Sequence, residues 1–527
     1  MSARRDAVNR AAAPRREIGY LGGVHELLKR VVNARVAEVL PEPTPLDRAP
    51  GLAAHCGREV MLKREDLTPI FSFKLRGAYN RIAHLDAAQC AAGVIAASAG
   101  NHAQGVAFAA TRLGLRCRVV MPRTTPAIKV AAVRRFGVEV ELVGDDYAAA
   151  AAHAATVAAA TGMTVVPPFD DLDVIAGQGT VGLEILRQAP RQLGSIFVPI
   201  GGGGLAAGIA AVVKAVRPDV RVIGVEPDDS DAMTRSLAAG ARVSLEHVGS
   251  FADGVAVRQV GALTFDLCRR HLDGTILVST DEICAAIEDV FEETRTVLEP
   301  AGALALAGLK RAHDDGTAAP GTAVVIASGA NMNFTRLGYV AERAEIGEQR
   351  EAILAVTIPE RPGSFLDFCR TLGERSVTEF NYRLATRAAA RVFVGIEVSG
   401  RPEALAIAER LRARGYACVD LGENDLAKTH VRHMVGGRSP LAHDEVLFSF
   451  EFPERPGALV QFLTGLGSRW NVSLFHYRNN GAAYGRVLCG FEVPATERAA
   501  LAAALAELGF RCADETDNPA ARLFLLR

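Results

Sequence analysis

One lysine, Lys74, lies among large apolar residues in the segment PIFSFKLRGAY (69–79), with Phe71, Phe73 and Leu75 as neighbours. Burying an ammonium group without a partner costs several kcal/mol, so burial favours the neutral amine and lowers its pKa. A neutral amine attacks carbonyl groups and accepts protons. The segment therefore predicts a reactive lysine in an apolar pocket, with an ordinary solvated lysine as the alternative.

Three further segments follow predicted strands, which is where ligands bind in α/β folds. SAGNHAQG (98–105) precedes a predicted helix and offers backbone N–H groups to a carboxylate or phosphate, although capping of an ordinary helix uses the same residue types. PIGGGGLAAG (199–208) has four consecutive glycines whose N–H groups can surround a compact anion. SGAN (328–331) places Ser328 at the end of another predicted strand.

The glycine segment also fits a dinucleotide-binding pattern. Gly201, Gly203 and Ala206 satisfy G-x-G-x-x-A, and Glu226 ends the next predicted strand at about the ~20-residue interval of that motif. No Gly-Lys-Ser/Thr follows the glycines, which excludes a nucleotide P-loop. The dinucleotide alternative leaves Lys74 and the SAGN segment without a role.

Pyridoxal 5′-phosphate is a ligand that uses all four segments. Its aldehyde reacts with a lysine, its phosphate binds N–H donors, and its pyridine nitrogen needs a hydrogen-bond partner. Gly77 and Ala78 lie three and four positions after Lys74, on the same face of a predicted helix. We expect these small residues to leave space for the flat ring.

The elements that position these residues alternate between short β-branched runs and helical patterns from about residue 58 to 340. The runs predicted as buried strands are GVIAAS (93–98), RCRVVMP (116–122), VEVELVG (138–144), SIFVPI (195–200), VRVIGVE (220–226) and TAVVIASG (322–329). This order predicts βαβ units and a mainly parallel sheet covered by helices on both faces.

An internal repeat occupies the C-terminal third of the chain. The segment 356–383 matches the segment 450–478, and each contains P-E-R-P-G followed by FNYR or FHYR. Each copy is predicted as a strand, a turn, a helix and two further strands, which suits a small α+β module. Residues 427–445 are the expected connector.

Composition excludes several other classes of protein. The chain has 527 residues, enough for three or four domains, and its 59 Lys+Arg and 60 Asp+Glu nearly cancel. This balance argues against a nucleic-acid or membrane-surface role. The nine cysteines include no C-x-x-C pair, so we expect reduced thiols and neither a disulfide framework nor a zinc site. Without a run of ~20 strongly apolar residues or an apolar signal core, a cytoplasmic location is expected.

The motifs together closely resemble the biosynthetic threonine dehydratases (threonine ammonia-lyases), which belong to the tryptophan-synthase-β-like, fold type II class of pyridoxal-phosphate enzymes. The resemblance extends from about residue 20 to the end of the chain. It rests on SFKLRGAYN, SAGNHAQGVA, GGGGLAAG, SGANMNF and the doubled FNYR/FHYR segment. It implies an α/β catalytic domain of two parallel-sheet subdomains (1–345), followed by two ACT-like regulatory modules (351–424 and 446–518).

The resemblance also implies roles for individual residues. Lys74 would form a Schiff base with the cofactor and remove the Cα proton of the substrate. Asn101 would bind the ring hydroxyl, and Ser328 would meet the pyridine nitrogen. The phosphate would be held by Gly201, Gly202, Gly203, Gly204 and Leu205. The substrate carboxylate would be held by backbone donors of Ser98, Ala99, Gly100, Asn101 and His102.

The implied activity is deamination of L-threonine to 2-oxobutanoate and ammonia, with some activity on L-serine. The implied regulation is feedback inhibition by isoleucine, relieved by valine, in a homotetramer. Related serine racemases have a second serine where this chain has Ala99, so racemisation should be minor. Metal-dependent relatives have an acidic ligand that the segment EPDDSDAM (226–233) lacks at the matching spacing, so no metal is expected to be required.

Three alternatives remain open at this point. The chain could be a serine-preferring dehydratase or a threonine synthase relative, and product analysis separates these. It could be a catalytically inactive amino-acid sensor, against which the intact Lys74 argues. The duplicated tail could serve only in oligomerisation, and its polar residues Asn381, Arg383, His476 and Arg478 either reach an effector or join the two modules.

Overall fold

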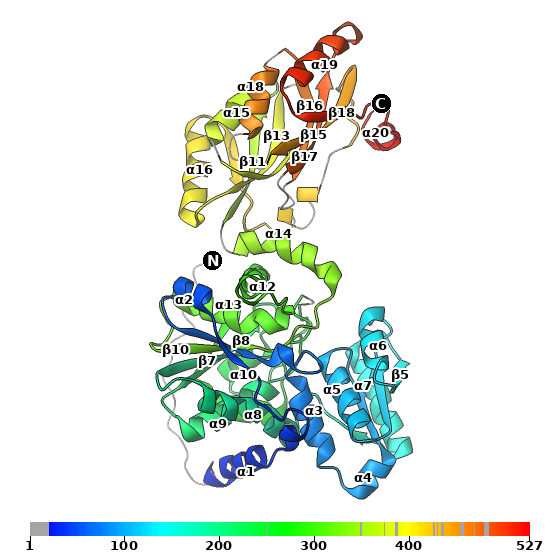
Figure 1. The fold of residues 1–527 in the computed structure, drawn as a ribbon, viewed down its shortest axis with the longest axis vertical. Coiled ribbons are helices and arrows are strands. Elements are labelled where there is room, and N and C mark those ends of the chain that lie inside the picture. The colour runs from blue at the N-terminus through cyan, green and yellow to red at the C-terminus, as the bar shows by residue number, and fades with distance from the viewer. Residues whose placement is uncertain are drawn as a thin grey trace. The chain divides into compact units, whose positions relative to one another are not determined.

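The computed structural model describes residues 20–249, 251–347, 350–373, 375–384, 388–424, 427–428, 431–433, 437–453, 458–467, 469–478 and 484–526. The chain divides into two compact units, Met1–Ala344 and Glu345–Arg527 (Figure 1). Each unit has its own sheets and its own core.

The first unit contains a small lobe built on a parallel sheet. Its strand order is β5-β4-β3-β6. The strands are β3 (Val94–Ala97), β4 (Cys117–Met121), β5 (Glu139–Leu142) and β6 (Thr164–Val165). The helices of this lobe are α3 (Lys74–Ala83), α4 (Ala87–Ala92), α5 (Asn101–Arg112), α6 (Ala127–Arg134) and α7 (Tyr147–Thr161) (Figure 1).

The larger lobe of the first unit contains a six-stranded sheet in the order β1-β2-β10-β7-β8-β9. All neighbouring strands are parallel except β1, which is antiparallel to β2. The strands are β1 (Leu46–Arg48), β2 (Val60–Arg64), β7 (Leu193–Pro199), β8 (Arg221–Pro227), β9 (Gly274–Val278) and β10 (Thr322–Ala327). The helices are α1 (Tyr20–Val32), α2 (Pro50–Cys56), α8 (Leu172–Gln188), α9 (Gly204–Val216), α10 (Ala232–Ala239), α11 (Ala262–His271), α12 (Thr280–Thr294) and α13 (Pro300–Asp314). The next helix, α14 (Leu337–Gly347), begins in the first unit and ends in the second.

All six predicted strands of this region are present, but they belong to two sheets. The runs at 93–98, 116–122 and 138–144 form the small lobe, and the other three form the centre of the large sheet. The pattern did not identify β2, although its five residues are all buried. Its sequence VMLKR contains two basic residues. Lys63 is paired with the distant Glu184, and Arg64 with the nearby Asp66.

Helix packing in the large lobe depends on glycine at close contacts. A Cβ at Gly208 on α9 would lie 2.6 Å from the carbonyl oxygen of Ile175 on α8. A Cβ at Gly177 on α8 would lie 2.7 Å from the Cα of Gly77 on α3. Since helices with side chains at such points must move apart, glycine sets the spacing of α3, α8 and α9.

The second unit is one antiparallel sheet built from the two repeats. Its order is β14-β11-β13-β12-β16-β17-β15-β18. The first repeat supplies β11 (Glu351–Pro359), α15 (Ser364–Leu372), β12 (Val377–Arg383), β13 (Ala389–Glu397), α16 (Arg401–Ala413) and β14 (Ala417–Asp420). The second supplies β15 (Glu445–Pro453), α18 (Ala458–Leu466), β16 (Asn471–Arg478), β17 (Tyr484–Glu492), α19 (Arg498–Glu507) and β18 (Arg511–Asp514), and α20 (Pro519–Phe524) follows.

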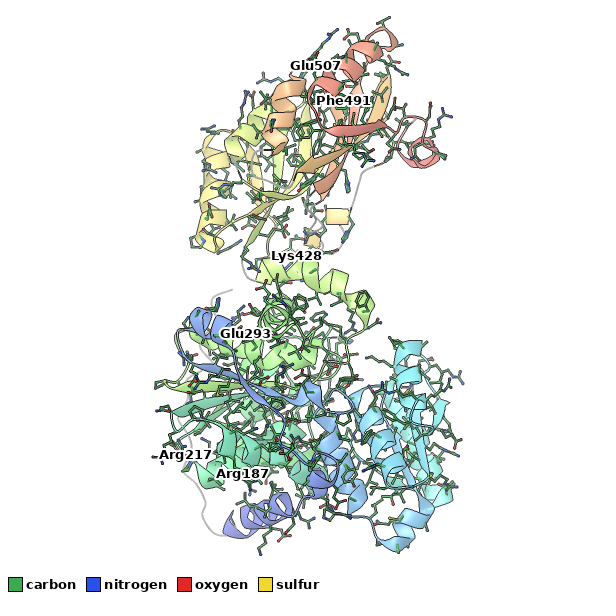
Figure 2. All side chains as sticks on the ribbon, viewed as in Figure 1. Arg187, Arg217, Glu293, Lys428, Phe491 and Glu507 are labelled. Carbon is green, nitrogen blue, oxygen red and sulfur yellow. The ribbon has the colours of Figure 1, made fainter. Side chains whose placement is uncertain are left out.

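The FNYR and FHYR segments meet at the centre of this sheet. Strand β12 pairs with β16, and Asn381 stands opposite His476. Aromatic residues of both repeats share one core, including Phe380, Phe475 and Phe491, the last labelled in Figure 2. The predicted α+β modules are therefore present, each with a second helix and a fourth strand beyond the predicted elements. Of the second P-E-R-P-G segment (453–457), residues 454–457 lie outside the described residues.

Two composition-based expectations concern the whole chain. All nine cysteines are free thiols, as the absence of paired spacings predicted. Among the described residues, no helix is long and apolar enough to cross a membrane.

Candidate active site

Lys74 is the first residue of α3, and its side chain is half-buried. Its Nζ donates a hydrogen bond to the carbonyl oxygen of Pro168 at 2.9 Å and lies 5.2 Å from the centre of the Phe73 ring. Burial lowers the pKa of Lys74 to about 8, and the nearby Glu299 carboxylate opposes this shift. The reactive amine predicted from the sequence therefore has a physical basis in the fold.

The SGAN segment lies against the residues that precede Lys74. The N–H of Phe73 donates to the carbonyl oxygen of Ser328 at 3.2 Å, and the N–H of Ala330 donates to that of Phe71 at 2.9 Å. Phe71 has a φ of 56°, an uncommon value for an aromatic residue, which these backbone contacts hold in place. The Ser328 hydroxyl is buried and donates to the carbonyl oxygen of Ala301 at 3.1 Å.

The Asn101 side chain connects three segments of the site. Its amide nitrogen donates to Glu299 Oε1 at 2.6 Å. Its oxygen accepts from Asn331 Nδ2 at 2.7 Å, and Asn331 also donates to the carbonyl oxygen of Ile70 at 2.9 Å. The SAGN segment, the SGAN segment and the chain leading to Lys74 therefore meet at this amide.

The glycine loop faces the segment that binds Lys74. A Cβ at Gly202 would lie 2.1 Å from the ring of Phe169, the neighbour of Pro168. Gly203 has a φ of 94°, and the Gly202 carbonyl accepts from the Thr264 hydroxyl at 2.6 Å. Side chains are thus excluded from the glycine loop at the N-terminus of α9, and no side chain in the described part of the chain caps this helix.

The N-terminus of α5 is also free of a side-chain cap. The first turn of any α-helix leaves N–H groups without intrahelical acceptors. His102, the second residue of α5, is buried, and its Nε2 lies 2.9 Å from the carbonyl oxygen of Val166. Its Nδ1 has no hydrogen-bond partner among the described residues. Burial and the charge of Lys74 lower the pKa of His102 to about 3, so the ring is neutral.

One prediction about the lysine helix is wrong. A Cβ at Gly77 would lie 2.4 Å from Gln178 Nε2 and 2.8 Å from the carbonyl oxygen of Val174, both on α8. Gly77 therefore permits close packing of α3 on α8 and does not leave space for a ligand ring. Its position three residues after Lys74 places it on a helix face that the fold buries.

The structure argues against the dinucleotide alternative, because its acidic residue, Glu226, is engaged within the fold. The Glu226 carboxylate accepts from the backbone N–H groups of Met233 and Thr234 at 2.8 Å each, and from the Thr234 hydroxyl at 2.7 Å. It is fully buried and caps α10. A carboxylate engaged in this way cannot bind a ribose.

The residues brought together fit pyridoxal 5′-phosphate. The site combines an amine with a lowered pKa, two helix N-termini without side-chain caps and a loop that only glycine can form. These groups match an aldehyde and a phosphate. Among the described residues, no cluster of three or more His, Cys, Asp or Glu could hold a metal ion.

The sequence did not identify Glu299 or Pro168 as part of this site, and it gave Asn331, the last residue of the SGAN segment, no role of its own. Glu299 precedes Pro300 at the start of α13. Acidic residues are common at this position because they stabilise the positive end of the helix dipole, so no ligand is needed to explain one. Pro168 contributes only its backbone carbonyl oxygen, a group that every residue has, so its residue type does not indicate this role.

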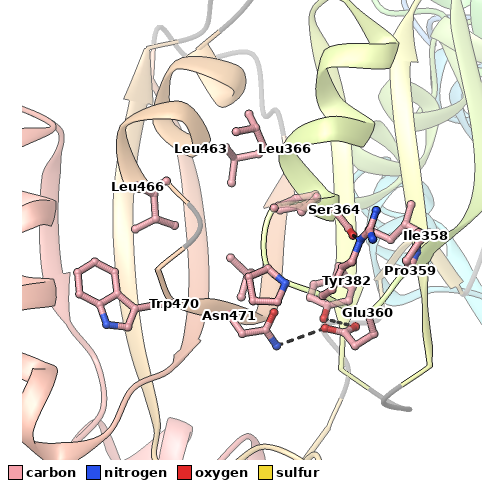
Figure 3. Close-up of a pocket in the computed structure, with 16 residues that line it drawn as sticks. Ile358, Pro359, Glu360, Ser364, Leu366, Tyr382, Leu463, Leu466, Trp470 and Asn471 are labelled. Carbon is pink, nitrogen blue, oxygen red and sulfur yellow. Dashed lines mark hydrogen bonds between the residues drawn. The ribbon is translucent and has the colours of Figure 1, made fainter.

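A pocket lies in the second unit, between the two repeats (Figure 3). It contains about 430 Å³ of space, part of it open to solvent. Its apolar lining includes Ile358, Leu366, Leu463, Leu466 and Trp470, and its polar lining includes Glu360, Arg361, Ser364, Tyr382 and Asn471. Glu360 accepts from the Tyr382 hydroxyl at 2.7 Å and from Asn471 at 3.3 Å, which connects the first repeat to the second.

Two residues considered as effector contacts have partners within the fold. Arg383 forms an ion pair with Glu445 and donates to the carbonyl oxygen of Gly437 at 2.8 Å. Asn381 is buried and donates to the carbonyl oxygen of Arg432 at 2.9 Å. These contacts support the alternative that the FNYR residues join the modules.

Comparison with known proteins identifies both parts of the chain. Residues 38–329 match the family model of pyridoxal-phosphate dependent enzymes, and residues 342–431 and 437–525 match that of the C-terminal regulatory domain of threonine dehydratase. The biosynthetic L-threonine dehydratase of Burkholderia multivorans is 55% identical over 504 residues, 95% of this chain and 99% of that protein. The Escherichia coli enzyme is 52% identical over 501 residues, 95% of this chain and 97% of that protein.

Solved structures agree with this assignment. Threonine deaminase isoform 2 from Solanum lycopersicum, in its processed form, is 43% identical with a TM-score of 0.61, covering 64% of this chain and 92% of that chain. These matches confirm the expected family, fold class and cofactor. The chain therefore belongs to the pyridoxal-phosphate-dependent enzyme family and, within it, to the biosynthetic threonine dehydratases with two C-terminal regulatory domains.

Proposed function

We propose that the protein is an L-threonine ammonia-lyase, which converts L-threonine into 2-oxobutanoate and ammonia at the first committed step of isoleucine biosynthesis. The observation that carries the proposal is Lys74, a half-buried amine whose pKa is lowered to about 8 beside the glycine loop and the SGAN segment. Two relatives named as biosynthetic L-threonine dehydratases match nearly the whole chain.

Lys74 acts as the general base in this proposal. When bound, pyridoxal phosphate supplies an electron sink for charge that develops at the substrate Cα. Lys74 accepts the Cα proton at Nζ, because a pKa of about 8 leaves part of the amine neutral at physiological pH. The β-hydroxyl then takes up one proton and leaves as water, and hydrolysis of the remaining enamine consumes one water and releases ammonia.

We assign the remaining residues to the cofactor and the substrate. Asn101 would bind the ring hydroxyl. Ser328 would donate to the pyridine nitrogen once its hydroxyl turns away from the carbonyl oxygen of Ala301. The residues that would hold the phosphate, at the start of α9, are Gly201, Gly202, Gly203, Gly204 and Leu205. The substrate carboxylate lies at the start of α5, held by Ser98, Ala99, Gly100, Asn101 and His102. The uncapped helix N-termini support both anion sites.

We assign the pocket of the second unit to isoleucine, the feedback inhibitor, with valine as the competing effector that relieves inhibition. Its leucine and isoleucine side chains suit a branched aliphatic group. Glu360 and Arg361 suit the ammonium and carboxylate groups of a free amino acid.

Further parts of the proposal concern specificity and assembly. L-Serine is a slower substrate, racemisation is minor because Ala99 provides no hydroxyl, and no metal ion is required. The protein is a cytoplasmic homotetramer, so light scattering should give a mass about four times the 55.8 kDa of the chain.

Product analysis of the purified protein tests the proposal. L-Threonine should yield equal amounts of 2-oxobutanoate and ammonia, faster than L-serine yields pyruvate. Isoleucine should reduce the rate, and valine should restore it. Faster pyruvate formation would favour a serine dehydratase. Isoleucine binding without any product would favour the amino-acid sensor.

A further inference from the structure

Glu299 is a buried acidic residue that the proposed mechanism does not use. It is 6% exposed and precedes α13. Its backbone N–H donates to the carbonyl oxygen of Gly329 at 3.1 Å, and its carboxylate accepts from the Asn101 amide at 2.6 Å. Burying a carboxylate lowers the stability of the folded protein, so a buried glutamate at this position indicates a function.

The surroundings fix the Glu299 carboxylate in one place. A Cβ at Gly329 would lie 2.5 Å from Glu299 Oε1, so the glycine of the SGAN segment makes room for this oxygen. A Cβ at Gly302 would lie 2.1 Å from the carbonyl oxygen of Gly329, which keeps that segment close to α13. The carboxylate therefore has little freedom to leave Asn101.

The contacts of Asn101 set the orientation of its amide. Only the nitrogen of an asparagine side chain donates, so the bond to Glu299 identifies the nitrogen, and the bond from Asn331 engages the oxygen. An amide nitrogen carries two hydrogens. The bond to Glu299 uses one, and the second remains to donate to a ligand.

We propose that Glu299 is a positioning residue, which orients the Asn101 amide so that its second hydrogen is directed to the ring hydroxyl of pyridoxal phosphate. The proposal rests on the assignment of Asn101 to the cofactor. It extends that assignment to a residue that would act on the cofactor through Asn101.

Charges around Glu299 are consistent with this role. Burial and Asp253 raise the pKa of Glu299 to about 7, while Asn101, Lys129 and Arg336 act in the opposite direction. Lys74 is also close enough to interact with it. Above pH 7 the carboxylate is mostly ionised and accepts a strong hydrogen bond from the amide.

A double-mutant cycle on cofactor affinity tests the proposal. The full-length protein is stripped of cofactor, and pyridoxal phosphate is titrated at pH 8 while the visible absorbance of the lysine-bound form is followed. Glu299→Ala should raise the dissociation constant roughly tenfold, the effect of removing a hydrogen bond to a charged group. Glu299→Gln should recover most of the affinity, because its amide oxygen still accepts from Asn101.

The effect of Glu299→Ala in a protein that lacks the Asn101 amide shows whether Glu299 acts through Asn101. In an Asn101→Ala protein, which itself should bind more weakly, Glu299→Ala should have little further effect. Full additivity, or equal losses in Glu299→Gln and Glu299→Ala, would overturn the positioning role. Unchanged affinity in Asn101→Ala would overturn the assignment of Asn101 and the inference with it, whereas the threonine reaction is tested separately. If Glu299→Ala does not fold, Glu299→Asp replaces it, because its shorter side chain cannot reach the amide.

Discussion

At the residue scale, Lys74 combines partial burial with access to ligand. Its hydrogen bond to Pro168 uses a carbonyl acceptor, which does not compensate the charge of an ammonium as a carboxylate would. Burial therefore dominates and lowers the pKa to about 8. The sequence predicted this outcome, because large apolar neighbours on both sides of a lysine are enough to indicate desolvation.

This pKa predicts the pH dependence of cofactor capture. Only the neutral amine attacks an aldehyde, so the rate of Schiff-base formation by the cofactor-free protein should rise with pH and level off above about pH 8. Stopped-flow absorbance measures this rate. An ordinary lysine would still gain rate up to about pH 10.4, and such a profile would show that Lys74 is solvated.

At the element scale, a buried charge network holds α3 in place. Arg76 on α3 binds Glu65 at 2.7 Å and Glu184 on α8 at 2.5 Å, and Lys63 on β2 binds Glu184 at 2.6 Å. Arg76 is fully buried two residues after Lys74, so the network fixes the helix that begins with the reactive lysine. Two positive and two negative groups balance each other there.

Arg76→Met should destabilise the first unit by roughly 3–5 kcal/mol, because it leaves a buried carboxylate without its partner. Urea unfolding followed by far-UV circular dichroism measures the loss. Trp470, the only tryptophan, reports on the second unit, and its fluorescence transition should not change. Arg187→Met on the exposed side of α8 is the matched control, expected within about 0.5 kcal/mol. Equal effects of the two substitutions would contradict the network's role.

The elements also show where sequence reasoning succeeds and fails. Strands such as β7 and β10 are continuous apolar runs that follow directly from composition. The prediction that Gly77 leaves space for the ring was wrong. Its neighbours on α8 lie about a hundred positions away in the sequence, and the residues around Lys74 give no sign of them. Glu299 was missed for a related reason, since an acid at a helix start has a sufficient local explanation.

At the scale of the whole molecule, the two C-terminal repeats form one continuous antiparallel sheet. The two copies pair through β12 and β16, and the pocket takes residues from both repeats. The sequence revealed the repeat but not the pairing of β12 with β16. The FNYR and FHYR residues are compatible both with a ligand site and with strands that join the two modules. The internal ion pair of Arg383 favours the second explanation for that residue.

Filling this pocket should weaken feedback inhibition by isoleucine. Leu366→Trp introduces a large ring at a partly exposed pocket position, so the isoleucine concentration for half-inhibition should rise at least about tenfold, the effect of losing ~1.4 kcal/mol of binding. Leu405→Trp on α16 is the control, because Leu405 is 47% exposed and does not line the pocket. Unaltered inhibition in Leu366→Trp, or equal loss in both variants, would contradict the assignment of the pocket.

The most direct test of the whole account compares the native protein with Lys74→Ala. The native protein should carry the visible absorbance of lysine-bound pyridoxal phosphate and form 2-oxobutanoate from L-threonine. Lys74→Ala should lose that absorbance, and its rate should fall by at least roughly 10²–10⁴-fold, the usual contribution of a general base. Retention of both properties in Lys74→Ala would show that the reactive amine lies elsewhere.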